Sequence, residues 1–130
     1  MKKLAIVLAA LLLASVFVGC NPSAMLPNSS WKGDWGEAYG NAYEVWTFNE
    51  DNTVDYTVYT KDGEVKTSTV SADWVLVDDI LTISGGYATG IWGVYRVEVT
   101  LSTLKLYEYD VFKQDYAEEP TYTLERYKVK

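Results

Sequence analysis

Histidine is absent from this 130-residue chain, and cysteine occurs once, as Cys20. Zinc sites built from histidine and cysteine, serine–histidine pairs and cysteine–histidine pairs all need residues that the chain does not supply. A disulfide within the chain is excluded for the same reason. The sequence therefore predicts no metal centre and no nucleophilic catalysis of these kinds.

Basic residues are also scarce, with 11 Lys and Arg against 18 Asp and Glu, a net charge of −7. Without Lys2 and Lys3, nine basic residues (11 − 2) face the same 18 acidic ones, which gives −9 for residues 20–130. Because binding to nucleic acid depends on positive charge, we expect no nucleic-acid partner.

Adjacent carboxylates occur three times, as Glu50–Asp51, Asp78–Asp79 and Glu118–Glu119. Glycoside hydrolysis needs two carboxylates that face one cleft, but each of these pairs lies in a predicted turn or loop. Calcium loops and phosphate-binding glycine motifs are not matched either. We expect a protein that is not an enzyme and that carries no cofactor and no metal.

The longest hydrophobic run lies at the start of the chain, from Leu4 to Val18, after the basic Lys2 and Lys3. As a helix it would reach about 22 Å, which is shorter than the roughly 30 Å hydrocarbon core of a bilayer. Its basic start, apolar middle and small Gly19 before Cys20 are typical of a secretory leader. The stretch Phe17-Val18-Gly19-Cys20 resembles the cleavage site of a bacterial lipoprotein.

This resemblance implies that residues 1–19 are a signal peptide and that the Cys20 thiol carries a lipid anchor in the membrane of a bacterial cell envelope. Asn21 after the cysteine favours the outer membrane. Residues 20–30 contain two prolines and no charged side chain. We therefore predict a flexible tether over 20–30 and one folded domain over 31–130.

The folded part shows the two-residue alternation of half-buried strands, for example in TVDYTVYT (53–60) and YRVEVTL (95–101). No helix is expected after Cys20. The eight predicted strands cover residues 31–35, 43–48, 53–60, 64–76, 80–84, 92–100, 103–109 and 121–128.

Short turns, such as NEDN (49–52) and KDGE (61–64), separate most of these strands, so sequential strands should pair as hairpins. Eight such strands favour an all-β, antiparallel up-and-down barrel, because closure removes exposed sheet edges. An immunoglobulin-like sandwich is the alternative, and it would need long connections at 85–91 and 110–120. The predicted inward side chains are Trp46, Phe48, Tyr56, Trp74, Leu76, Leu81, Ile83, Val97, Val99, Leu104 and Leu106.

Trp31, Gly33 and Trp35 should share one face of the first strand, with Gly33 leaving a gap between the two rings. Arg126 falls on the apolar face of the last strand, where stacking on an indole ring would stabilise its charge. The G-x-W of Gly33-Asp34-Trp35 and the late Arg126 resemble a lipocalin-like domain. The resemblance implies that Arg126 packs across Trp35 at the closed end of the barrel.

The aromatic side chains of the strands and of the glycine-rich loop allow two interpretations, core packing and ligand binding. Trp46, Tyr56 and Trp74 serve either as core or as lining for a small apolar or aromatic ligand. The glycine-rich loop SGGYATGIWG (84–93) adds Tyr87, Ile91 and Trp92 as candidates for the mouth of such a site, while Trp92 could instead begin a strand. Small-ligand binding at a shallow mouth is the main hypothesis. A protein-contact or scaffold role in the envelope, including inhibition of a host enzyme such as lysozyme, is the alternative.

Overall fold

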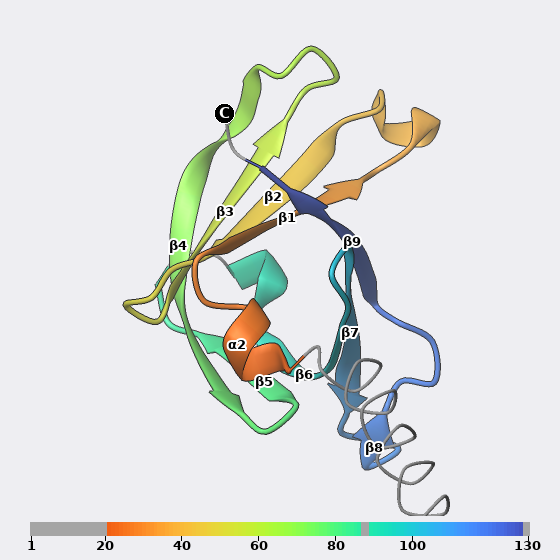
Figure 1. Cartoon of the computed structure of the whole chain (residues 1–130). Coiled ribbons are helices and arrows are strands. Elements are labelled where there is room, and N and C mark those ends of the chain that lie inside the picture. The colour runs from red at the N-terminus through yellow and green to blue at the C-terminus, as the bar shows by residue number, and fades with distance from the viewer. Residues whose placement is uncertain (1–20, 87–88, 129–130) are drawn as a thin grey trace, which may run out of the picture.

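A computed structural model describes residues 21–86 and 89–128 of the chain, and these form an antiparallel β-barrel (Figure 1). Eight strands pair in the order β1-β2-β3-β4-β5-β6-β7-β9, and the pairing of β9 with β1 closes the ring. The two-residue β8 pairs only with the end of β7. The strands are β1 (Ser29–Asp34), β2 (Tyr43–Phe48), β3 (Thr53–Tyr59), β4 (Val65–Val77), β5 (Ile80–Ser84), β6 (Gly93–Val99), β7 (Thr103–Asp110), β8 (Asp115–Tyr116) and β9 (Tyr122–Tyr127).

The predicted eight-stranded barrel is confirmed, and each barrel strand agrees with its predicted range to within two residues. Hairpin pairing follows from the turns, because Asn52 and Asp78 adopt the left-handed conformation (φ 65° and 56°) that tight turns need and that these residue types tolerate. The sandwich alternative is wrong, since one continuous ladder closes on itself.

The barrel interior is filled by one hydrophobic cluster from every barrel strand. The predicted inward set is confirmed: all its members belong to this cluster or pack against it. Aromatic rings meet mostly edge to face, as in Phe48–Trp74 (centroids 5.6 Å apart) and Trp46–Tyr122 (4.9 Å). This core therefore leaves the ends of the barrel as the places where a ligand could reach it.

The two ends of the barrel differ in what surrounds them. In an up-and-down barrel alternate connections lie at the same end, so residues 35–42, 60–64, 85–86, 89–92 and 111–121 surround one end, here called the mouth. The turns 49–52, 78–79 and 100–102 surround the other end, here called the base. Strand β1 begins and β9 ends at the base.

The segment 20–30 differs from the predicted tether in its described part. Residues Pro22–Met25 form a short helix, α2, capped by the Asn21 side chain, which accepts a hydrogen bond from the Ser23 amide (3.1 Å). Leu26 is fully buried in the barrel core, and Met25 packs against it. These two apolar side chains explain the difference, because their burial stabilises the folded segment, whereas a flexible tether would leave them exposed to water. The folded domain thus begins before residue 31.

The expectation of no helix after Cys20 is also wrong in two short 3-10 turns, η1 (Glu37–Tyr39) and η2 (Thr89–Ile91). Both lie in connections at the mouth. Within the described residues, no helix is long and apolar enough to cross a membrane.

The tryptophan beneath Arg126 is Trp31, which corrects the predicted contact with Trp35. Trp31 lies directly opposite Arg126 in the β1–β9 pair, and the guanidinium carbon lies 5.4 Å from the Trp31 ring centroid. Trp35 follows the end of β1, so it lies toward the mouth instead. Arg126 is in the inward register but at the end of the barrel, where its side chain is exposed.

Candidate functional site at the barrel mouth

A carboxylate points into the barrel near its mouth. Glu44 shares the inward face of β2 with Trp46 and Phe48, and only 6% of it is exposed. Its oxygens accept hydrogen bonds from Trp35 Nε1 (2.8 Å), Trp46 Nε1 (3.0 Å) and Tyr56 Oη (2.9 Å). All three donors are neutral, so the burial of the carboxylate is offset by hydrogen bonds without an ion pair.

Gly33 makes room for this carboxylate. It lies opposite Glu44 in the β1–β2 pair, and a Cβ at Gly33 would lie 2.7 Å from Leu124 Cδ2 and 3.2 Å from Glu44 Cγ. Real Cβ atoms do not tolerate the shorter contact without a shift of the leucine. The gap predicted between the rings of Trp31 and Trp35 is thus filled by Leu124 and Glu44.

Two tyrosines lie above Trp46, toward the mouth. Tyr95 donates a hydrogen bond to the Ile91 carbonyl (2.8 Å), and Tyr122 donates one to the Gly90 carbonyl (3.3 Å), which ties the 85–92 connection to the barrel. Burial raises the pKa of Tyr122, and the negative charges of Glu44 and then Glu108 raise it further. Tyr122 therefore lies within the field of two carboxylates at this end of the barrel.

Glu108 is the second of these carboxylates. It continues the inward register of Leu104 and Leu106 along β7 and pairs with Tyr95 across the β6–β7 ladder. The β7–β9 pairing ends at Leu106–Tyr122, two residues before Glu108, and Glu108 is exposed at the rim of the barrel. The side chain of Glu108 forms no ion pair or hydrogen bond with any described residue.

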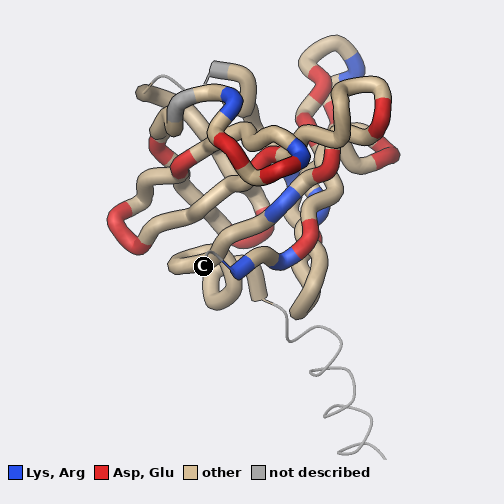
Figure 2. The backbone as a smooth tube through the Cα atoms, turned by 90° about the horizontal axis from the view of Figure 1, so that it is seen from above, with Lys and Arg blue, Asp and Glu red and all other residues tan. Residues whose placement is uncertain are grey.

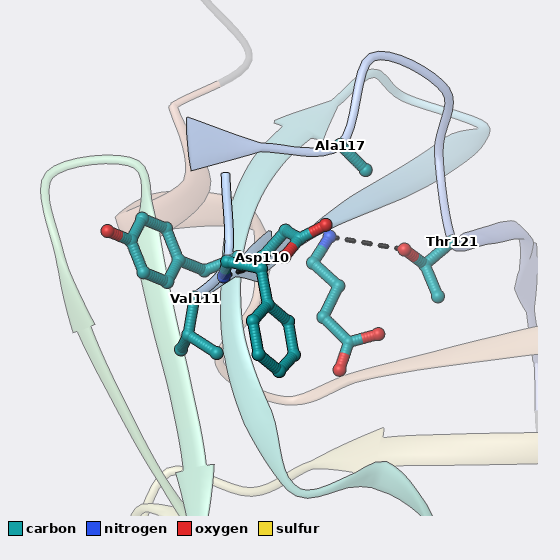
Figure 3. Close-up of a pocket in the computed structure, with 7 residues that line it drawn as sticks. Asp110, Val111, Ala117 and Thr121 are labelled. Carbon is teal, nitrogen blue, oxygen red and sulfur yellow. Dashed lines mark hydrogen bonds between the residues drawn. The ribbon is translucent and has the colours of Figure 1, made fainter. Parts of the chain in front are cut away.

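A hollow of about 310 Å³ opens beside Glu108 (Figure 3). We call it the mouth hollow. In Figure 3, Thr121 lies to the right of Asp110 and Val111, with Ala117 at the top. The Glu108 amide donates a hydrogen bond to Thr121 Oγ1 (3.2 Å). Its lining consists of Glu108, Tyr109, Asp110, Val111, Phe112, Ala117 and Thr121.

Two apolar side chains of this lining are unusually exposed. Val111 is 68% and Phe112 96% exposed. The turn that presents them is held by the Asp110 carboxylate, which accepts hydrogen bonds from the amides of Phe112 (2.9 Å) and Lys113 (3.3 Å). These hydrogen bonds fix the backbone of the turn that carries the exposed phenyl ring next to the hollow, where a bound molecule could cover the ring.

An acidic hollow adjoins the first one. It has a volume of about 430 Å³ and shares Asp110 and Ala117 with the mouth hollow. Its remaining lining is Lys113, Asp115, Tyr116, Glu118 and Glu119. Four carboxylates against one ammonium make this rim strongly negative, and acidic residues outnumber basic ones along the whole tube in Figure 2.

The structure places the aromatic residues that the sequence offered as ligand lining mostly in the packed interior. Trp46 has no exposed surface and Trp74 only 5%, with its indole donating to the Thr53 carbonyl (3.0 Å). Tyr56 is partly buried beside Glu44, closer to the mouth. Ligand contact by Tyr56 stays a prediction, whereas Trp46 and Trp74 contribute to the core.

The glycine-rich loop is described only in part. Tyr87 lies outside the described residues. Ile91 is 1% exposed and belongs to the core. Trp92 is 43% exposed, with its indole donating to the Gly85 carbonyl (2.8 Å), and it has the outward register of Val94. A role for Ile91 and Trp92 at the mouth remains a prediction.

Sequence reasoning missed Glu44, Glu108 and Phe112. The first two carried a usable signal, because each continues an apolar every-second-residue face: Glu44 with Trp46 and Phe48, and Glu108 with Leu104 and Leu106. Phe112 carried none, since an apolar residue in a long loop does not show whether it folds inward or outward. No group of three or more potential metal ligands occurs within residues 21–86 and 89–128.

A family model described as a lipocalin-like domain matches residues 28–106, more than half of the chain. The matched range starts just before β1 and ends within β7. No curated protein and no solved structure matches the chain.

Proposed function

Because the chain belongs to the lipocalin-like domain family, we propose that it binds a small ligand, and that it does so in the mouth hollow rather than deep inside the barrel. The filled interior supports this location, since Trp31, Trp46 and Phe48 are each 0% exposed. A small molecule of drug size needs about 300 to 1,000 Å³. The mouth hollow, at about 310 Å³, is near the lower limit of that range.

The single observation that carries the proposal is the exposed Phe112 in the lining of this hollow. A phenyl ring held in water forgoes about 1.5 to 3 kcal/mol of burial energy. A ligand that covers the ring would recover part of that energy without a change in the barrel.

Isothermal titration with fatty acids, retinoid-like compounds, aromatic metabolites and short glycans tests the proposal. At least one class should bind, and Phe112→Ser should weaken that binding about tenfold or more. Leu101→Ser is the matched control, because Leu101 is 76% exposed in a turn at the base. Equal weakening by both substitutions, or no binding at all, would contradict a site in the mouth hollow.

We further propose that the protein is a lipid-anchored, non-enzymatic component of a bacterial cell envelope, attached through Cys20. The resemblance of residues 17–20 to a lipoprotein cleavage site supports this. Since β1 begins at the base, an anchor that precedes it there would direct the mouth away from the membrane. Cys20→Ser should abolish lipidation. An unchanged protein mass and unchanged partition into detergent would contradict the anchor.

A protein-contact role is the second candidate, and the 96% exposure of Phe112 supports it as well. The two functions differ in their response to the titration above. If no small molecule binds but an envelope protein co-purifies with the wild type and not with Phe112→Ser, the protein-contact role replaces small-ligand binding.

A further inference from the structure

We propose that the ligand of the mouth hollow is a small organic cation, an ammonium group carried on an apolar or aromatic body. This inference rests on the proposed small-ligand function and names its chemical class. Four features of the described residues support it: an unpaired carboxylate, aromatic rings, an apolar wall and a negative rim.

The carboxylate of Glu108 would face the ammonium group. It lines the hollow and has no cationic partner, since the ion pairs recorded among the described residues are Lys32–Asp34 and Arg96–Glu98. Glu44 adds a second negative charge below it, and after burial the charges of Glu44 and Glu108 raise the pKa of Tyr122. A cation in the hollow would therefore meet an attractive potential, whereas a carboxylate ligand would be repelled.

Aromatic rings at the mouth supply the second attraction, because a ring face attracts a cation by about 0.5 to 2 kcal/mol. The Lys66 ammonium already lies over the ring of Trp35, 5.8 Å from its centroid, at this end of the barrel. Phe112 lines the same hollow as Glu108 and is 96% exposed, and no cation lies over its ring among the described residues.

The apolar wall determines what carries the cation. Val111, Phe112 and Ala117 present hydrocarbon surface to the same hollow that Glu108 lines. An amine attached to a phenyl or short alkyl body would bury that surface while its ammonium group reaches Glu108. A bare inorganic cation would leave the wall uncovered, so it fits the hollow less well.

The negative rim favours the approach of cations over anions. The adjoining hollow has four carboxylates and one lysine, and residues 20–130 carry a net charge of −9 (nine basic against 18 acidic residues). Such a field raises the local concentration of small cations, and salt should weaken the effect.

Three ligands of nearly equal shape test the inference by titration calorimetry: phenethylamine, phenethyl alcohol and hydrocinnamate. The amine should bind about tenfold more tightly than the alcohol, and hydrocinnamate should bind most weakly. Glu108→Gln should remove the preference for the amine, so that the ratio of the amine affinity to the alcohol affinity falls to about one. Glu98→Gln is the matched control on the outer face of the barrel and should preserve the preference.

The outcomes separate this inference from the proposed function. If all three compounds bind equally and Phe112→Ser weakens each, small-ligand binding stands and the preference for cations is wrong. If Glu108→Gln folds normally by circular dichroism but keeps the preference, Glu108 does not recognise the ammonium group and the inference fails. If none of the three binds while another class from the wider panel does, only the cation inference falls.

Discussion

Two glutamates on opposite faces of the barrel wall, Glu44 and Glu98, each accept a hydrogen bond from a tyrosine at the same distance. Tyr56 donates to Glu44 and Tyr107 to Glu98, both at 2.9 Å. The side chain of Glu98 is 50% exposed and pairs with Arg96 (2.9 Å), whereas Glu44 is 6% exposed and receives only neutral donors. The same pair of groups is thus placed in two different electrostatic environments.

The difference between the two sites is in what compensates the charge. Outside, Arg96 lowers the pKa of Glu98, and the Tyr107 hydroxyl lowers it further, while water screens the pair. Inside, two indoles and one phenol take the place of water around Glu44, and no described cation neutralises it. Removing the Glu44 carboxylate should therefore cost much of the free energy of unfolding, and its charge beneath the mouth has no cationic partner among the described residues.

The largest expected effect is that of Glu44→Ala. The substitution leaves three indole or phenol donors at the carboxylate position without their acceptor, and each unsatisfied buried donor costs about 1 to 3 kcal/mol. We expect a loss of about 3 to 5 kcal/mol in the free energy of unfolding, measured by denaturant titration. Glu98→Ala, the external counterpart, should cost about 1 kcal/mol or less. Equal losses would show that burial does not distinguish the two carboxylates.

Gly33→Ala should destabilise the protein by about 1 to 3 kcal/mol, because the new methyl group would meet Leu124 and Glu44 in the packed interior. The double variant Gly33→Ala with Leu124→Val shortens the side chain that lies closest. If the clash causes the loss, the double variant should lose less stability than the sum of the two single changes. If the losses of the two single variants simply add in the double variant, the clash with Leu124 does not cause the loss.

Much of the barrel could be predicted from the sequence, because strand period, turn residues and short connections are local signals. The alternation in 53–60 and 95–101 predicts which faces point inward, and Val54, Tyr95, Val97 and Val99 are buried as expected. The alternation is wrong at two positions, because β6 ends before the exposed Leu101 and Thr57 is buried on the expected outer face. Leu26 shows the limit of such signals. One apolar residue among prolines and polar residues has no period, and only the finished barrel provides the core in which it is buried.

The candidate site was less predictable, because it depends on where strands end. Arg126 was expected over Trp35, but the β1–β9 register places it over Trp31. Register between the first and last strands is a long-range property that neither strand encodes by itself. The exposure of Glu108 likewise depends on the β7–β9 pairing, which ends at Leu106–Tyr122, two residues before Glu108.

Alkaline pH should lower the free energy of unfolding through the buried tyrosines of the barrel interior. Burial raises the pKa of Tyr56 and Tyr95 above the ordinary value of 10.0, and the charge of Glu44 adds to the shift of Tyr56. On raising the pH, the two tyrosines lose their protons in the unfolded chain before they do so in the folded protein. The stability that the two protonated hydroxyls contribute is therefore fully present below pH 10 and is lost as pH rises through their pKa values in the folded protein. Tyrosinate absorbance and denaturant titration should show this loss, and Tyr56→Phe should reduce its pH dependence. A flat stability profile above pH 10 would contradict the burial of these hydroxyls.

The smallest expected effect is the acid response of the external pair. The pKa of Glu98 is lowered from its ordinary value of 4.5, chiefly by the hydrogen bond from Arg96. Its contribution to stability is therefore present above pH 4.5 and is lost as pH falls through the folded pKa. Because the glutamate is half exposed, water and salt screen the interaction to about 0.2 to 0.5 kcal/mol.

The free energies of unfolding of the wild type and of Glu98→Gln, measured between pH 7 and pH 3, test this expectation. The difference between the two proteins should shrink on acidification. A difference that stays constant with pH would mean that the Arg96–Glu98 pair contributes packing rather than charge. In that case the contrast with Glu44 would be one of burial alone.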